Sequence, residues 1–381
     1  MKNEYYVIIT GGKNNAGDFL IKKRAKSLLK HLRPDRQIIE YNSWDNFDEK
    51  KIQVINDSEC LILTGGPALV PKMNGKTYNF KDNLPKITVP ISIFGLGWYS
   101  HKGSWESVEN YKFSDQSLSL LNRVSSQTKF LSVRDYHSLE VLKRNNIENG
   151  LMTGCPALYD MDSMVKEFKS SGTKNITFSV GVTFSESEKT DKLQKQIILD
   201  LRENYPNSNI TIAFHHSIDD NYLKTVNPRL KLFKKNRQMA KWCAENKFKV
   251  IDISGGIEKL EDLYSNTDLH LGYRVHAHIF CCSKNITSYL ISEDGRGNAL
   301  ENVLPGSVFR GFENSFRENY LLLIMNKLFN LDLMKINKNL PKIIFSRIKS
   351  HENIDFQNFS SIRLLINKQF QVMKLYLNSL P

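Results

Sequence analysis

The sequence predicts an α/β fold with two doubly wound domains that face each other across a cleft, followed by C-terminal helices. Short apolar runs alternate with amphipathic stretches, a pattern typical of parallel sheets with helices on both faces. The pattern occurs twice, and after Pro305 it changes to helical segments separated by Asn-rich turns. The chain has 381 residues, 40% hydrophobic and 24% charged, which fits a soluble globular protein of more than one domain.

The first domain is predicted over residues 1–165. An amphipathic stretch from about Asp18 to His31 follows the first apolar run and is expected to form a helix. β-branched and aromatic residues dominate the remaining short runs, which favours strands. The expected strands are Tyr5–Thr10, Gln37–Tyr41, Cys60–Thr64, Ile91–Phe94 and Phe130–Val133.

The second domain is predicted over residues 172–306, after a polar boundary stretch that contains Ser170, Ser171 and Gly172. Helical patterns near residues 189–204, 236–246 and 257–265 lie between its strand candidates. Those candidates are Asn175–Val180, Asn209–Phe214, Phe248–Ile253, Leu269–Leu271 and Ile286–Ile291.

A helical extension is predicted over residues 307–381. Its two most apolar stretches, 316–334 and 361–377, carry too many large apolar residues for isolated helices in water. One interpretation is that both pack back on the domains. The other is that a basic amphipathic face contacts an anionic membrane, on which lipid-linked glycans are found.

The charge pattern bears on partners. The formal net charge is +13, and residues 310–381 hold 11 Lys/Arg against 5 Asp/Glu. A basic surplus suits nucleic acid, anionic lipid or a polyanionic substrate, but no nucleic-acid-binding motif accompanies it, so nucleic acid is not expected. We expect a cytoplasmic protein, which could also be peripheral to the inner face of the membrane. The reasons are five cysteines without a disulfide framework, no signal-peptide pattern and no long apolar run.

Glycine-bearing turns follow two strands of the first domain, at the sheet edge where ligands of parallel sheets bind. The first turn holds Asn15, Gly17 and Asp18, and the second holds Gly65 and Gly66. Backbone N–H groups of such turns can approach an anion at a helix start. The alternative is that Asp18 or Asn15 only caps the helix and that the glycines only permit tight turns.

Two further segments offer cations at strand ends. Arg134 precedes Asp135, and a structural contact with Asp135 or with backbone is the alternative to ligand binding. Arg274 and His276 alternate, so on an extended segment they share one face. A guanidinium can grip a carboxylate or phosphate through two hydrogen bonds, and an imidazole can transfer a proton near neutral pH. The histidine pairs lack ligand-spaced partners, so no metal site is expected.

These segments together resemble the polysaccharide pyruvyl transferase family. Asn15-Ala16-Gly17-Asp18 is similar to its N-x-G-D signature, Gly65-Gly66 to its glycine-rich turn and Ser132–Asp135 to its S-x-R-D segment. Arg274-Val275-His276 is similar to its R-L-H segment, with Val275 in place of leucine. The order and approximate spacing agree over residues 5 to about 305, whereas Glu293-Asp294-Gly295-Arg296 is not assigned to a family segment.

The resemblance implies two Rossmann-like domains similar to the glycosyltransferase-B class. It also implies transfer of a pyruvyl group from phosphoenolpyruvate to sugar hydroxyls as a ketal, in the synthesis of a surface polysaccharide such as a capsule. Arg274 and Arg134 would then bind the donor, His276 and Asp18 would be catalytic, and the Asn15, Gly17, Gly65 and Gly66 turns would support the donor site. We expect no cofactor.

Two other functions remain open at this point. A glycosyltransferase of the same two-domain shape would use the same cations to bind the diphosphate of a nucleotide sugar. A non-catalytic protein that binds carbohydrate or anions could also keep the fold. Phosphoenolpyruvate turnover distinguishes the three functions.

Overall fold

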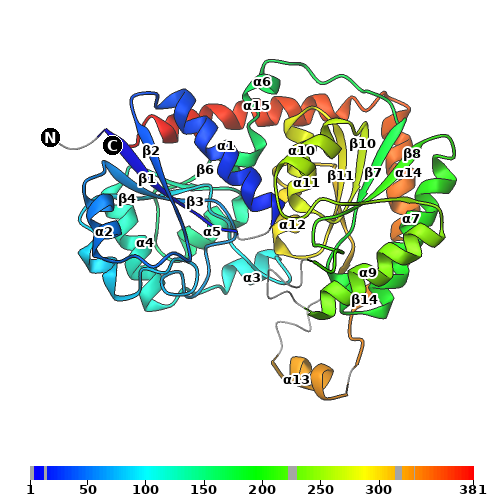
Figure 1. Ribbon diagram of the computed structural model, residues 1–381, viewed down its shortest axis with the longest axis horizontal. Coiled ribbons are helices and arrows are strands. Elements are labelled where there is room, and N and C mark those ends of the chain that lie inside the picture. Colours follow the sequence, from blue (N-terminus) through cyan, green and yellow to red (C-terminus); the bar gives the residue numbers. More distant parts are fainter. Residues whose placement is uncertain (1–3, 13–14, 222–229, 314–319, 330) are drawn as a thin grey trace. The chain divides into compact units, whose positions relative to one another are not determined.

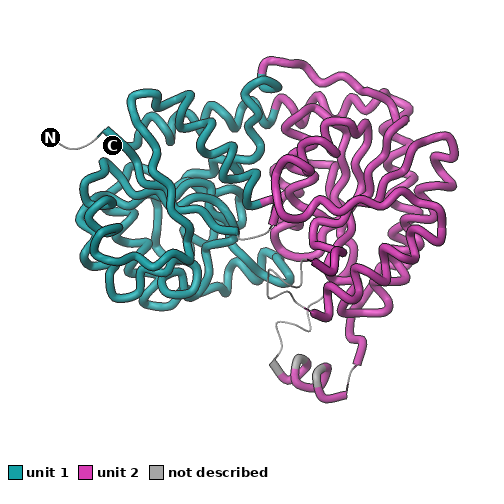
Figure 2. Tube along the Cα trace, viewed as in Figure 1, with its two compact units in different colours: residues 1–13, 18–164, 365–381 teal, residues 14–17, 165–364 magenta. Residues whose placement is uncertain are grey.

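The computed structural model describes residues 4–12, 15–221, 230–313, 320–329 and 331–381. The chain divides into two compact units, coloured separately in Figure 2. The first unit comprises residues 1–13, 18–164 and 365–381, and the second comprises residues 14–17 and 165–364. Each unit has a parallel sheet of its own, so the predicted α/β class with parallel sheets is confirmed.

The first unit is built on a four-stranded parallel sheet in the order β2-β1-β3-β4. Its strands are β1 (Tyr5–Thr10), β2 (Gln37–Asn42), β3 (Cys60–Thr64) and β4 (Ile91–Phe94). The short parallel pair β5 (Leu131–Val133) and β6 (Gly150–Met152) continues beyond β4, because Leu96 N–H donates to Ser132 O and Arg134 N–H to Leu96 O.

Among the described residues before Val165, the α-helices are α1 (Ala16–Leu32), α2 (Glu49–Asn56), α3 (Trp105–Glu109), α4 (Asp115–Gln127), α5 (Tyr136–Arg144) and α6 (Met161–Met164). Side-chain caps fix where several of them begin. Asp48 accepts from Lys51 N–H at the start of α2, and Ser114 accepts from Ser117 N–H at the start of α4. Such caps satisfy backbone donors that have no partner inside the helix.

The second unit is built on a six-stranded parallel sheet in the order β12-β11-β10-β7-β8-β9. Its strands are β7 (Asn175–Ser179), β8 (Asn209–Phe214), β9 (Lys249–Asp252), β10 (Leu269–Gly272), β11 (Thr287–Ser292) and β12 (Val308–Arg310). The connecting helices are α7 (Glu188–Asn204), α9 (Leu230–Glu245), α10 (Glu258–Ser265), α11 (Val275–Ser283) and α12 (Gly295–Leu300). In Figure 1, α10 and α11 cover one face of this sheet, and α7 and α9 cover the other.

The remaining elements follow the second sheet. They are the antiparallel pair β13 (Phe312–Glu313) and β14 (Lys335–Ile336), and the helices α13 (Tyr320–Phe329), α14 (Leu340–Glu352) and α15 (Asn358–Leu377). The predicted C-terminal helices are thus confirmed, although residues 316–319 and 330 of the first apolar stretch lie outside the described residues.

The two apolar stretches of the C-terminal region differ in burial. In α15 the apolar residues Ile362, Phe370 and Met373 are buried, so this helix packs back on the folded units. In α13 they are not: Leu321 is 70% exposed and Leu328 is 72% exposed. None of the described helices combines the length and the apolar content needed to cross a bilayer.

Candidate functional site

The second unit has a topological switch point between β7 and β10. From β7 the chain winds outward through β8 to β9, then returns to β10 and winds the other way. Open parallel sheets bind their ligands at the carboxyl ends of the strands beside a switch point, so the ends of β7 and β10 mark the candidate site. Ser179 and Gly272 are the last residues of these strands. A Cβ built on Gly272, with φ +156°, would lie 2.5 Å from backbone atoms of Ser179, so only glycine fits.

Arg274 lies just beyond the end of β10, as the residue that precedes α11. Its backbone N–H donates to Ser179 Oγ (3.1 Å), and its side chain makes no capping bond. The half-buried guanidinium makes neither a hydrogen bond nor an ion pair with any residue that the structure describes. Burial lowers the pKa of Arg274, against the opposing charge of Glu293. Its donors are therefore available to an anion.

His276 lies in the first turn of α11, and the start of α1 packs against it. A Cβ built on Gly17 would lie 2.0 Å from Nδ1 of His276, so the glycine lets backbone approach the imidazole closely. Gly17 N–H also donates to Asn15 Oδ1 (3.2 Å), which makes Asn15 a helix cap. The structure therefore brings Asn15, Gly17, Arg274 and His276 together within the second unit.

Arg274 and His276 do not lie on one extended segment, so the prediction that they alternate there and share one face is wrong. The helix α11 begins at Val275, so only Arg274 keeps an extended backbone, and residues two apart on a helix do not face the same side. Their proximity comes from the strand-to-helix turn.

Glu293 is a site residue that the sequence reasoning missed. It directly follows β11, and its Oε1 accepts from the N–H groups of Val182 (2.8 Å) and Thr183 (2.7 Å), beyond β7. Burial raises the pKa of Glu293, while those N–H groups and the charge of Arg274 lower it. Because the net effect is a raised pKa, the Glu293 carboxyl holds a proton more readily than an ordinary glutamate. Its position after a strand of the predicted sheet was the available signal.

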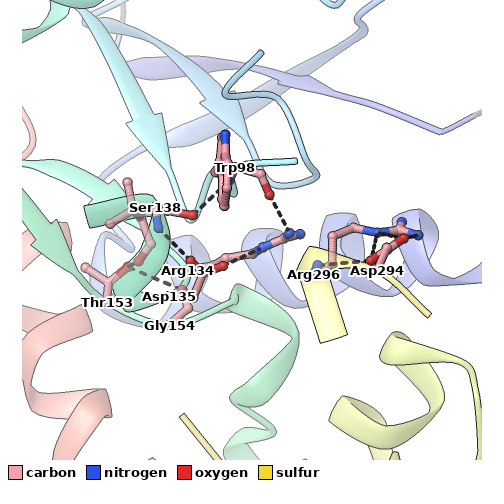
Figure 3. Close-up of polar contacts among 9 residues, drawn as sticks. Trp98, Arg134, Asp135, Ser138, Thr153, Gly154, Asp294 and Arg296 are labelled. Atoms are coloured by element: carbon pink, nitrogen blue, oxygen red, sulfur yellow. Dashed lines mark hydrogen bonds and ion pairs between the residues drawn. The ribbon is translucent and has the colours of Figure 1, made fainter. Parts of the chain in front are cut away.

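Asp294 and Arg296 follow Glu293 at the start of α12. Asp294 Oδ1 accepts from Arg296 N–H (3.0 Å), and the Arg296 guanidinium forms an ion pair with the same carboxylate at 2.6 Å (Figure 3). Asp294 thus caps a helix and also neutralises an arginine. Arg274 and Arg296 therefore differ, because only Arg296 has an internal carboxylate partner in the part of the chain that the structure describes.

The first unit has its own switch point, between β1 and β3, and the predicted glycine turns lie there. A Cβ built on Gly65 (φ +62°) would lie 2.2 Å from Ile21 of α1, so Gly65 allows close helix packing. Gly66 (φ +74°) faces open space within 4 Å. Asp18, in the first turn of α1, lies over Gly12, where a Cβ would be 2.6 Å from the carboxylate.

Arg134 is nearly buried in the first unit, with 5% exposure, at the end of β5. Its Nε donates to Asp135 Oδ2 (3.1 Å), and its Nη2 donates to Trp98 O (3.4 Å), as Figure 3 shows. Asp135 in turn caps α5 by accepting from Ser138 N–H (2.7 Å). These are the structural contacts that the sequence left open as an alternative. The Nη1 group makes no hydrogen bond within the described residues, so part of the guanidinium can still reach a ligand.

Two other features lie outside the candidate site. A cavity of about 770 Å³ in the second unit is lined by Asn175, Asn209 and Lys249, which lie at the amino ends of their strands, the edge opposite Arg274. In the described chain, no group of three or more His, Cys, Asp or Glu residues is arranged to hold a metal ion.

The fold and the site define a class first: an α/β protein with a cation at the carboxyl edge of a parallel sheet, where anionic ligands bind. The family comparison is more specific. Residues 15–295 match the model of the polysaccharide pyruvyl transferases, so the chain belongs to that family. No curated protein matches the sequence. Family membership makes the chain a transferase that acts on polysaccharide.

Solved structures show the same fold in distant proteins. S. aureus MnaA in complex with UDP is similar over 92% of this chain and 97% of its own, at 12% identity and a TM-score of 0.50. The UDP-GlcNAc 2-epimerase of Neisseria meningitidis bound to UDP-GlcNAc is similar over 91% and 100%, at 12% identity and a TM-score of 0.48. The likeness to MnaA supports the expected glycosyltransferase-B-like fold.

Proposed function

We propose that the protein transfers the pyruvyl group of phosphoenolpyruvate to two hydroxyls of a sugar, as a cyclic ketal. The observation that carries the proposal is the Arg274 guanidinium. It is half-buried, lies at the N-terminus of α11 and has no hydrogen-bonding partner in the described protein. Such a group suits a carboxylate, which phosphoenolpyruvate has and an ordinary sugar lacks.

In the proposed reaction, a residue of the second unit transfers the proton. His276 donates a proton to C3 of the enol, which becomes the methyl group, and C2 gains positive character. One sugar hydroxyl adds to C2, phosphate leaves, and the second hydroxyl adds in its place. Of the two hydroxyl protons, one restores the proton that His276 gave, and the other leaves with the phosphate. An imidazole suits this role because it can both give and take a proton near neutral pH. The proposed reaction uses no cofactor.

The remaining donor-site roles also stay proposals. Arg274 is assigned the carboxylate of the donor, and the backbone turn at Asn15 and Gly17 supports the site beside His276. Arg134, through its Nη1 group, is a candidate phosphate ligand, with Gly65 and Gly66 as supporting turns. Asp18 is the next candidate acid if His276 proves to bind the donor rather than transfer the proton.

We also propose that α13 mediates contact with an anionic membrane, from which a lipid-linked acceptor would be drawn. Its exposed residues Leu321, Ile324, Met325, Leu328 and Phe329 recur at the spacing of one helix face. Residues 310–381 carry a surplus of positive charge. An exposed apolar face is typical of helices that lie in the plane of a membrane surface, and a basic surplus would favour binding to anionic lipid. The acceptor and the cytoplasmic location belong to the same proposal.

Donor turnover tests the proposed function. The protein is incubated with candidate glycans and either phosphoenolpyruvate or nucleotide sugars, and released phosphate and nucleoside diphosphate are measured. Phosphate release that depends on both phosphoenolpyruvate and glycan supports the proposal. Release of nucleoside diphosphate would instead identify a glycosyltransferase, and binding without turnover of any donor would identify a carbohydrate- or anion-binding protein.

A further inference from the structure

A buried chain of serine and histidine side chains runs from Arg274 into the core of the second unit. Arg274 N–H bonds to Ser179 Oγ (3.1 Å), and Ser179 Oγ contacts His270 Nε2 (2.9 Å). His270 Nδ1 and His278 Nδ1 each lie 2.8 Å from Ser288 Oγ. All four of these side chains are fully buried, at 0% exposure. The two histidines are therefore joined through one hydroxyl.

The chain ends on a backbone carbonyl, and with both histidines neutral this fixes the direction of every bond in it. Ser307 Oγ donates its one proton to Leu304 O (2.6 Å), so at its 3.2 Å contact it accepts from His278 Nε2. His278 Nε2 therefore carries a hydrogen. A neutral imidazole has one N–H, so His278 Nδ1 is an acceptor.

The direction of the next bonds follows from the acceptor role of His278 Nδ1. Ser288 gives its only proton to His278 Nδ1, so it accepts from His270 Nδ1. His270 Nε2 then has no proton and accepts from Ser179 O–H. Ser179 Oγ is left with lone pairs that accept the N–H of Arg274. Each group thus donates its hydrogen to the next group in the direction of Leu304, and all bonds of the chain run the same way.

Both histidines must be neutral for this arrangement, and their burial agrees. Burial lowers the pKa of His278 to about 3 and lowers the pKa of His270 well below its ordinary value, with the neighbouring imidazole of His278 adding to the effect. Their tautomers differ: His270 carries its hydrogen on Nδ1, and His278 carries it on Nε2.

We propose that His270 is a positioning residue, which holds Ser179 so that its hydroxyl oxygen fixes the backbone of Arg274 and thereby aims the guanidinium at the donor. The step toward Arg274 is a backbone N–H, which cannot pass a proton on, so the chain positions and does not relay. Tyr273 N–H is also held by Ser179, through the backbone O (2.9 Å). Misplacing a binding group by about 1 Å can cost on the order of a hundredfold in rate.

A matched pair of variants tests this role. H270Q keeps an acceptor near the position of Nε2, toward Ser179, whereas H270N keeps a donor near the position of Nδ1, toward Ser288. Both remove one bond of the chain, but Asn also leaves a larger void than Gln, so the free energy of unfolding of each variant is measured beside its Kd. We expect H270N to raise the Kd for phosphoenolpyruvate by up to about tenfold, and H270Q to stay near wild type. Equal losses in the two variants would overturn the proposal.

The identity of the ligand in this test rests on the proposed function. Two measurements without ligand therefore test the role of His270 separately. Nitrogen NMR of the wild-type protein with labelled histidine should show Nδ1–H on His270 and Nε2–H on His278 at neutral pH. The Arg274 amide should exchange with solvent faster in H270N than in H270Q. The opposite tautomers, a charged imidazole, or equal exchange in the two variants would contradict the inference even if phosphoenolpyruvate binds as proposed.

Discussion

In the proposed function, Arg274 is the residue on which donor binding depends most directly. Arg274→Lys keeps the charge but replaces a planar two-bond contact with a point charge. Losing one charge-assisted hydrogen bond costs about 1.5–3 kcal/mol, so the Kd for phosphoenolpyruvate should rise roughly ten- to a hundredfold. Calorimetric titration measures it. Arg310→Lys is the matched control, because Arg310 is an exposed arginine of the same unit and pairs with Glu301. Unchanged affinity in folded Arg274→Lys would remove Arg274 from the site.

His276 is expected to transfer the proton rather than hold the donor. His276→Ala should lower turnover by roughly 10²–10⁴-fold and leave the Kd for phosphoenolpyruvate near its wild-type value. Gly17→Ala should have the same kind of effect, since its Cβ would force the imidazole to move, whereas Gly11 has nothing within 4 Å and Gly11→Ala should be silent. If binding collapses in His276→Ala while turnover at saturating donor survives, the histidine is a ligand and the acid lies elsewhere.

For single residues, the sequence indicated which of them lie at the sheet edge but not which partners they bind. Strand ends and glycine turns pointed to Arg274, His276 and Gly17, because parallel strands bring their carboxyl ends to one edge. Glu293 was not predicted, because its role depends on the turn after β7, more than a hundred residues away in the chain. The contact of Arg134 with Trp98 O is of the same long-range kind.

In α13, five large apolar residues are exposed: Leu321, Ile324, Met325, Leu328 and Phe329. Replacing Leu321, Leu328 and Phe329 with serine should abolish co-sedimentation with anionic vesicles at low salt, because the apolar contact is lost. The control replaces Leu364 and Leu375, two exposed leucines of α15, and should still sediment. Binding of the wild type should weaken as salt rises, since the attraction to lipid is screened. Wild-type protein that stays in the supernatant at low salt would contradict the proposal.

The strands were the elements best predicted from sequence. Cys60–Thr64, Ile91–Phe94 and Asn209–Phe214 agree residue for residue with β3, β4 and β8, because each is a short apolar run bounded by turn residues. The helix α9 begins at Leu230, earlier than the 236–246 pattern suggested. The three-residue strand β6 escaped prediction, since its pairing with β5 is what defines it.

For the whole molecule, the buried histidines make stability depend on pH. Burial lowers the pKa of His215, His270 and His278, whereas in the unfolded chain each titrates near 6.5. Below about pH 6.5 the unfolded chain therefore binds protons that the folded chain does not, and stability falls as the pH drops toward about 3. Each neutral histidine contributes at most about 1.4 kcal/mol per pH unit.

Urea unfolding at about pH 7.5 and about pH 5.5 measures this effect. The midpoint should fall at the lower pH, and in H270Q it should fall less, because one titrating group is gone. A midpoint that does not move in the wild type, or that moves equally in H270Q, would contradict the account of neutral buried histidines.

The central claim is that the second unit uses Arg274 and His276 to move a pyruvyl group. The most direct measurement follows isotope from phosphoenolpyruvate labelled at C3 into the glycan, by NMR of the purified product. The account predicts a labelled methyl group on a ketal carbon, formed together with one phosphate per ketal and lost in His276→Ala. Label that appears only in free pyruvate, or a glycan that stays unlabelled while nucleotide sugar is consumed, would contradict it.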